Sequence, residues 1–188
     1  GLVRVRVPGG GRPKPLVLDP LPPGARNDFE LSGTVAITRL DDSIARRISR
    51  TAEHEMERAG FHCPVETRVL DGPAQGVAFS VTAAWRGMTL ACFSSIGRRG
   101  KPAEKVAKEA ARAMLHFIES RATLDPFIAD QLVVPLSLAG AESRYTTSDV
   151  TQHLMTNLET AAAFTGISFE VKGDVGSPGE VRIAPVVT

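Results

Sequence analysis

Apolar and polar positions along the middle of the chain predict compact alternating elements. Residues 34–38 alternate with a period of two, which is typical of a strand with one buried face. Asp41 stands where a helix N-cap is expected, and Gly60 stands where that helix is expected to end. Between them, apolar residues recur every four positions and predict an amphipathic helix. These residues are Ile44, Ile48, Ala52 and Met56.

Three strands and a second helix are predicted next. The strand patterns cover residues 62–70, 76–85 and 88–96, and Arg86-Gly87 indicates a tight hairpin turn between the last two. Pro102 is expected at the first position of the second helix. The buried stripe of this helix comprises Val106, Ala110, Ala113, Met114 and Phe117, and Lys101, Lys105, Lys108 and Arg112 are expected to lie away from it.

The flanking sequence predicts further elements. Residues 2–7 alternate valine or leucine with arginine and predict a strand, and the Pro- and Gly-rich residues 8–28 form a connection with one short strand at 15–18. Asp125 and Pro126 are expected to open a helix that Pro135 kinks or ends. The remaining pattern predicts a strand at 143–147, a helix at about 149–164 capped by Ser148, and strands at 167–173 and 179–187.

Composition narrows the class of protein without choosing a partner. The chain has 188 residues, of which 43% are hydrophobic, enough for one large or two small folded units. Its 22 basic and 21 acidic residues nearly cancel, so a nucleic-acid partner would need a local basic patch. Cys63 and Cys92 match neither a zinc pattern nor a redox motif, and no apolar run is long enough for a membrane span. We expect a cytoplasmic protein that does not engage a membrane.

His153 is the strongest candidate for a catalytic residue in the sequence. It lies in the opening turns of a predicted helix, one position off a buried stripe formed by Val150, Leu154, Leu158 and Ala161. The backbone N–H groups at a helix N-terminus favour an anion and disfavour imidazolium. A neutral imidazole beside a bound phosphate suits a nucleophile. The alternative from position alone is that His153 only packs or forms hydrogen bonds.

Arg98, Arg99 and Lys101 form the densest basic cluster in the sequence. Three cations beside glycines in a loop could contact RNA phosphates without sequence preference. An ordinary solvated loop remains the alternative for such a run of charges.

Three stretches, SIGRRGKPAEKVAKEAA, ADQLVVPLSLAG and YTTSDVTQHLMTN, resemble in order and spacing the carboxy-terminal half of the RNA 3'-terminal phosphate cyclase family. The resemblance implies an enzyme that uses ATP to adenylate a histidine, passes AMP to an RNA 3'-phosphate and leaves a 2',3'-cyclic phosphate. His153 matches the adenylated histidine. Asp130 and Gln131 match residues of the adenylate pocket, and Phe127 stands where the family usually has a tyrosine beside the nucleotide.

The chemistry of these matching residues is consistent with that role. A carboxylate such as that of Asp130 accepts hydrogen bonds from ribose hydroxyls or helps to order Mg²⁺ or Mn²⁺ near phosphate. Phenylalanine at position 127 keeps stacking but loses a hydroxyl contact. Without the resemblance, Asp130 and Gln131 are expected on a solvated helix face and Phe127 in the core.

The resemblance also implies a fold and a division of the chain. The expected class is α/β in two layers (α+β), with small sheets covered by helices on one face. Residues 33–122 would be an inserted α/β domain, and residues 1–32 and 123–188 would be parts of the last repeat of a catalytic domain. A long upstream part that carries further ATP and RNA contacts would be missing, so this chain alone is expected to be inactive. The alternatives are a non-catalytic cyclase-like scaffold in RNA processing and, on a similar repeat fold, an enolpyruvyl transferase.

Overall fold

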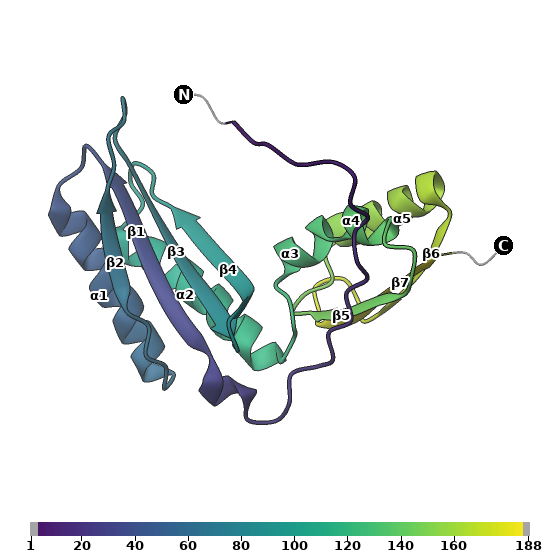
Figure 1. Cartoon of the computed structure of the whole chain (residues 1–188). Coiled ribbons are helices and arrows are strands. Elements are labelled where there is room, and N and C mark those ends of the chain that lie inside the picture. The colour runs from purple at the N-terminus through teal and green to yellow at the C-terminus, as the bar shows by residue number, and fades with distance from the viewer. Residues whose placement is uncertain (1–3, 186–188) are drawn as a thin grey trace. The chain divides into compact units, whose positions relative to one another are not determined.

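The computed structural model describes residues 4–185 and divides into two compact units (Figure 1). The central unit is Pro20–Asp125. The flanking unit combines the chain up to Asp19 with the chain from Pro126 onward. The assignment of the flanks to a catalytic-domain repeat stays a prediction.

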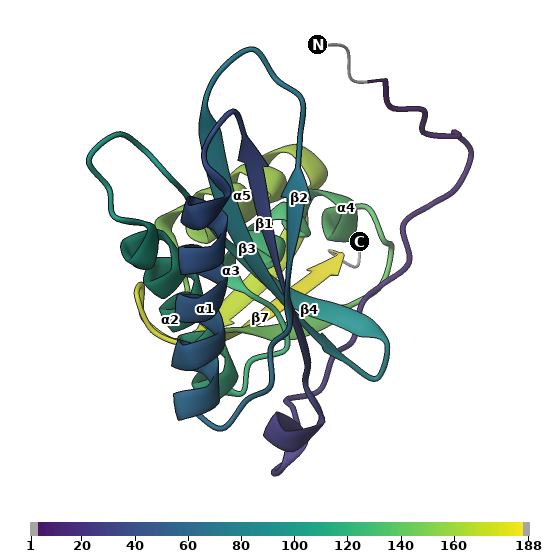
Figure 2. The ribbon, with the colours of Figure 1, turned by 90° about the vertical axis from the view of Figure 1, so that its left-hand side faces the viewer.

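The central unit is a four-stranded sheet with two helices on one face. Its elements are η1 (Ala25–Asp28), β1 (Glu30–Thr38), α1 (Asp42–Arg58), β2 (Val65–Val69), β3 (Gly76–Trp85), β4 (Met88–Ile96) and α2 (Ala103–Ser120). The sheet order is β2-β1-β3-β4, and only β1 and β2 pair in parallel. Helices α1 and α2 cover one face of the sheet, as Figures 1 and 2 show. The predicted order of strand, helix, three strands and helix is confirmed.

Local signals in the central unit mostly act as expected. Asp41 Oδ1 accepts a hydrogen bond from the Ser43 N–H at 2.8 Å, which makes Asp41 the N-cap of α1. Arg86 and Gly87 both adopt positive φ, 51° and 79°, as a tight hairpin turn requires. Pro102 is the N-cap of α2 and not its first residue, because its ψ of 144° is still extended.

The flanking unit has a three-stranded sheet and three helices. Its elements are α3 (Pro126–Gln131), α4 (Val133–Ser137), β5 (Ser143–Thr147), α5 (Gln152–Thr165), β6 (Ile167–Lys172) and β7 (Gly179–Pro185). The sheet order is β5-β7-β6, antiparallel throughout. The helices lie on one face of this sheet (Figure 1). Its core includes the predicted stripe of α5 together with residues of β5 and β7, namely Val150, Leu154, Leu158, Ala161, Tyr145, Val181 and Ile183.

Both units therefore have the predicted two-layer α/β architecture. The strand predicted at residues 2–7 is wrong where it can be judged: residues 2 and 3 lie outside the described residues, and residues 4–7 pair with no strand. An alternating pattern supplies a buried face, but a strand also needs a hydrogen-bonded neighbour. The short strand predicted at 15–18 is reduced to one bridge, Val17 to Arg144, beside β5. Within residues 4–185, no helix combines the length and the apolar character needed to cross a membrane.

Candidate functional site

His153 lies at the start of α5, and neighbouring loop contacts determine where that helix begins. The Val150 N–H donates to the Ser177 carbonyl and the Gly176 N–H donates to the Val150 carbonyl, each at 2.8 Å. These bonds hold the chain extended up to Thr151, whose Oγ1 caps the helix by accepting from the Leu154 N–H at 3.0 Å. The predicted start near residue 149 with Ser148 as cap is therefore wrong. Ser148 is instead fully buried.

This start makes His153 the second residue of α5, with its side chain exposed. The first N–H groups of a helix lack intrahelical acceptors. The Thr151 hydroxyl satisfies the N–H of Leu154, and Gln152 and His153 are the first two residues of the helix, whose N–H groups have no intrahelical acceptor. The backbone around His153 is thus suited to an anion such as a phosphate.

The other predicted site residues lie on the short helix α3. Phe127, Asp130 and Gln131 are separated by three and four positions, so they share one face of the helix. Phe127 is 56% exposed, Asp130 is half-buried and Gln131 is exposed. The core position that the sequence alone suggested for Phe127 is therefore wrong.

Side chains from β5 and α5 hold the end of α3. The helix predicted to run to Pro135 is interrupted earlier, at Leu132, and Pro135 lies inside α4. Pro135 has no N–H to donate to the carbonyl four residues earlier, that of Gln131, which favours a break at this place. The Tyr145 hydroxyl donates to the Ala129 carbonyl at 2.7 Å, and the Asn157 Nδ2 donates to the Asp130 carbonyl at 3.3 Å. These two bonds tie the backbone of α3, which carries the predicted pocket residues, to β5 and α5.

Asn157 also relates α3 to His153. It lies four residues after His153, so the two side chains project from the same side of α5. The bond from Asn157 to Asp130 therefore brings α3 against the side of α5 on which His153 sits. The structure in this way places the backbone of Asp130 against α5 one turn after His153, and Phe127 and Gln131 share the helix face of Asp130.

Tyr145 is the positioning residue that the sequence did not reveal. It is fully buried, and burial raises the pKa of its phenol, with the nearby Asp130 carboxylate as a second cause. The phenol consequently stays neutral and keeps the proton that it donates to Ala129. The only available signal was a tyrosine at an inward-facing position of a predicted strand, which is equally typical of simple packing.

The basic cluster is divided by the structure into an anchor and two exposed side chains. The Lys101 ammonium donates to Ser95 Oγ at 2.9 Å and to the Ile96 carbonyl at 3.1 Å, and it forms an ion pair with Glu109. The expectation that Lys101 projects away as a flexible cation is therefore wrong. Arg98 and Arg99 are exposed in the same loop.

Within residues 4–185, no group of three or more His, Cys, Asp or Glu side chains is arranged to hold a metal ion. Asp130, whose backbone carbonyl accepts the hydrogen bond from Asn157 of α5, is the carboxylate predicted for this site. A metal that arrives with a nucleotide is held largely by phosphate oxygens and water, so one carboxylate fits that mode of binding.

The family model and the relatives that match this chain carry the same family name. The family model described as the RNA 3'-terminal phosphate cyclase (RTC) insert domain matches residues 29–119, which run from just before β1 almost to the end of α2. Proteins named RNA 3'-terminal phosphate cyclase are similar over more of the chain. The protein from Pyrococcus furiosus is 32% identical over 157 residues, which is 84% of this chain and 45% of the relative.

Two further relatives carry the same name. The Thermococcus gammatolerans protein is 36% identical over 81% of this chain and 44% of its own length. The Methylococcus capsulatus protein is 34% identical over 97% of this chain and 50% of its own length. The chain thus spans about half the length of the curated relatives that it matches. Because the similarity extends beyond the insert to α3, β5 and α5, the chain belongs to the RNA 3'-terminal phosphate cyclase family.

Proposed function

We propose that the intact protein is an ATP-dependent RNA 3'-phosphate cyclase, a ligase-class enzyme of RNA processing in the cytoplasm. It would convert an RNA 3'-phosphate end to a 2',3'-cyclic phosphate through a covalent adenylate on His153. The relatives that bear this name support the proposal. The two cysteines are free thiols, which is consistent with a reducing compartment.

One observation carries the assignment of the nucleophile. His153 is exposed at the second position of α5, and Asn157 one turn later bonds to the Asp130 backbone. An imidazole at a helix N-terminus, with a carboxylate-bearing segment packed beside it, can approach a phosphate while backbone N–H groups face the negative oxygens.

The proposed reaction consists of three displacements. An imidazole nitrogen of His153 attacks the α-phosphorus of ATP, so an N–P bond forms and the bond to pyrophosphate breaks. An oxygen of the RNA 3'-phosphate then attacks the same phosphorus and releases the imidazole. Finally, the vicinal 2'-hydroxyl loses its proton and attacks the RNA phosphorus, which expels AMP.

The α3 residues would position the nucleotide. Asp130 would accept hydrogen bonds from ribose hydroxyls or from metal-bound water, and Gln131 can both donate and accept. Phe127, 56% exposed, offers a ring on which adenine can stack. Bound Mg²⁺ or Mn²⁺ would supply neutralisation of the phosphate charge in this reaction.

Sequence beyond this chain is part of the proposal. The chain covers about half of its relatives' length, and we propose that the remaining part of the protein supplies further phosphate and RNA contacts. Electrostatic stabilisation of the transferring group is the main source of catalysis in such reactions. We therefore expect the 188-residue chain alone to cyclise RNA weakly or not at all. Robust cyclisation by the purified chain would contradict this part of the proposal.

The test uses the intact protein and ATP labelled at the α-phosphate. The wild type should retain protein-bound label that is acid-labile and base-stable, as a phosphorus–nitrogen bond requires, and His153→Ala should retain none. His54→Ala is the matched control, because His54 is an exposed histidine of the central unit, and it should label like the wild type. Label that persists in His153→Ala would refute the role of His153. No label on any variant would favour a non-catalytic scaffold or an enolpyruvyl transferase.

A further inference from the structure

The loop between β4 and α2 displays two arginines on a rigid turn. The Lys101 N–H donates to the Arg98 carbonyl at 2.9 Å, which closes a four-residue turn, and Gly100 at its third position has a φ of +83°. The Gly97 N–H donates to the Val77 carbonyl at 2.8 Å and ties the start of the loop to β3. The backbone that carries Arg98 and Arg99 is therefore fixed at both ends.

The charges around this turn are unequally compensated. Glu109 pairs with the Lys101 ammonium, and Glu104 holds the Arg47 guanidinium through two hydrogen bonds of 2.8 and 2.9 Å. Arg98 and Arg99 are exposed and form no ion pair with any described residue. Two positive charges thus remain available on a turn that Lys101 anchors.

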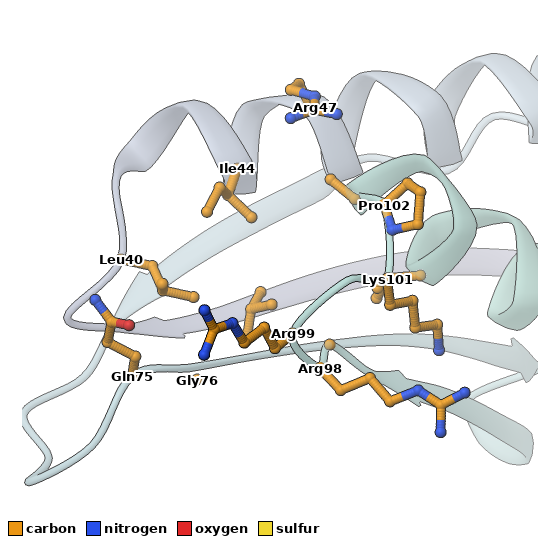
Figure 3. A pocket seen from close by; sticks show the side chains of 13 residues that line it. Leu40, Ile44, Arg47, Gln75, Gly76, Arg98, Arg99, Lys101 and Pro102 are labelled. Atoms are coloured by element: carbon orange, nitrogen blue, oxygen red, sulfur yellow. The ribbon is translucent and has the colours of Figure 1, made fainter.

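Two hollows of the central unit meet at this turn. The larger has a volume of about 630 Å³ and the smaller about 240 Å³, and both are lined by Arg98, Arg99 and Lys101. Among the described residues, no acidic side chain lines either hollow. In the larger one, Figure 3 shows the Arg99 side chain extending toward Gln75 and Leu40, whereas Arg98 extends the opposite way.

The larger hollow also has an apolar wall and a helix end. Ile44, Val77 and Val106 contribute aliphatic surface, while Ala103, the first residue of the 18-residue helix α2, places the positive end of the helix dipole at the cavity. A free inorganic anion gains nothing from contact with apolar side chains, whereas a nucleotide carries both a charged phosphate and an apolar ring.

We propose that this surface, the Arg98–Arg99 turn with its two hollows, binds the phosphate backbone of single-stranded RNA. Each hollow receives one phosphate of the strand, and the apolar wall of the larger one accepts a sugar or base. Two cationic hollows that share one turn match a polymer that presents phosphates in succession. The surface belongs to the central unit and needs neither ATP nor His153, so it does not depend on the proposed cyclisation.

The experiment measures fluorescence anisotropy of a labelled single-stranded RNA of about twelve nucleotides with a 3'-hydroxyl end, within the usual span of a single-strand site. The RNA is titrated with the 188-residue chain without ATP. The test variant is Arg98→Gln with Arg99→Gln. The matched control is Arg50→Gln with Arg112→Gln, which removes the same charge from two exposed arginines of the central unit that line neither hollow. Circular dichroism checks that all three proteins are folded, as expected for exposed side chains.

The test variant should bind RNA at least about tenfold more weakly than the wild type. The slope of log affinity against log salt should also become less steep by about 1.4, because each phosphate that the variant no longer neutralises on a single strand contributes roughly 0.7. The control should stay within about threefold of the wild type. Equal losses in both variants, or no loss in either, would overturn the proposal. Displacement of the RNA by an equal concentration of inorganic phosphate would also overturn it, because the site would then select a free anion. The 3'-hydroxyl end makes the outcome independent of whether the protein is a cyclase.

Discussion

Tyr145→Phe is the sharpest probe of how the flanking unit places its candidate site. The substitution removes one oxygen and leaves the ring in place, so it deletes only the 2.7 Å hydrogen bond to the Ala129 carbonyl. Tyr145 and Ala129 are both fully buried, which means that water cannot replace the missing donor. Leaving a buried acceptor unsatisfied costs about 1–3 kcal/mol.

Hydrogen exchange read by mass spectrometry measures this cost locally. Amides of α3 and of the Leu132 turn, whose N–H donates to the Ile128 carbonyl at 3.0 Å, should lose protection by roughly 5- to 150-fold, which corresponds to that free energy. Amides of β3 and β4 in the central unit are the internal control and should not change. Unchanged protection of α3 in the variant would refute the claim that Tyr145 holds this helix.

The pKa of Tyr145 gives a second readout of the same arrangement. Burial, with the Asp130 carboxylate as a second cause, raises the pKa of the folded phenol above its unfolded value near 10. The unfolded state therefore loses its proton first as pH rises, so the contribution to stability is complete below about pH 10 and is lost progressively above it. At about pH 11 the free energy of unfolding should be about 1.4 kcal/mol lower on this account, and Tyr145→Phe should not show this decrease. Because the chain has one tyrosine, its ultraviolet absorbance titrates that residue directly, and a native midpoint at the unfolded pKa would contradict the buried placement.

Two further predictions concern the central unit. Gly33→Ala should destabilise it by about 1–3 kcal/mol, because a Cβ there would lie 2.8 Å from Val65 Cγ2 and 3.0 Å from Phe79 Cε2. Urea unfolding, followed by the fluorescence of the chain's one tryptophan, Trp85, measures this loss of stability. Ser32→Ala, at an exposed position of the same strand, is the control and should change the stability little. A Gly33→Ala variant as stable as the wild type would show that the sheet relaxes easily. At about pH 8 a thiol reagent should modify exposed Cys92 but not buried Cys63. Burial, with the Glu53 carboxylate as a second cause, raises the pKa of Cys63 to about 11, so only about a thousandth of this thiol is thiolate at that pH. Peptide mass spectrometry identifies the modified residue, and equal rates for both thiols in the folded chain would be incompatible with the buried position.

The fold was predictable where local signals and periodicity agree. The strands at 76–85 and 88–96 were predicted to the residue, because the Arg86-Gly87 turn marks where one ends and the next begins. Their register shifts between Ala83 and Ala84, which the turn does not specify. Asp41 marked the start of α1 for a similar reason: its carboxylate satisfies a backbone N–H only two residues away. Signals that act within one turn of the chain can be read from the sequence alone.

Contacts between residues that lie apart in the sequence explain the predictions that were wrong. Nothing near Ser148 indicates that residues 175–177 hold Val150 extended and delay the start of α5 to Gln152. Lys101 resembled any surface lysine because Glu109 lies eight residues further along, in the second turn of α2. The exposure of Phe127 likewise depends on how α3 packs, which periodicity over six residues cannot specify.

The candidate site depends on both kinds of information. Resemblance selected His153 and Asp130 by their motifs, but the placement of α3 against β5 and α5 depends on Tyr145 and Asn157, which contact the backbone of α3 and not the side chains of the motif. All of these contacts lie between Pro126 and Asn157, so the flanking unit positions Asp130 with its own residues. If the isolated chain fails to form an adenylate, the cause should therefore lie in the stabilisation of the transferring phosphate rather than in a misplaced Asp130. Native exchange protection of α3 in the inactive chain would separate these two causes.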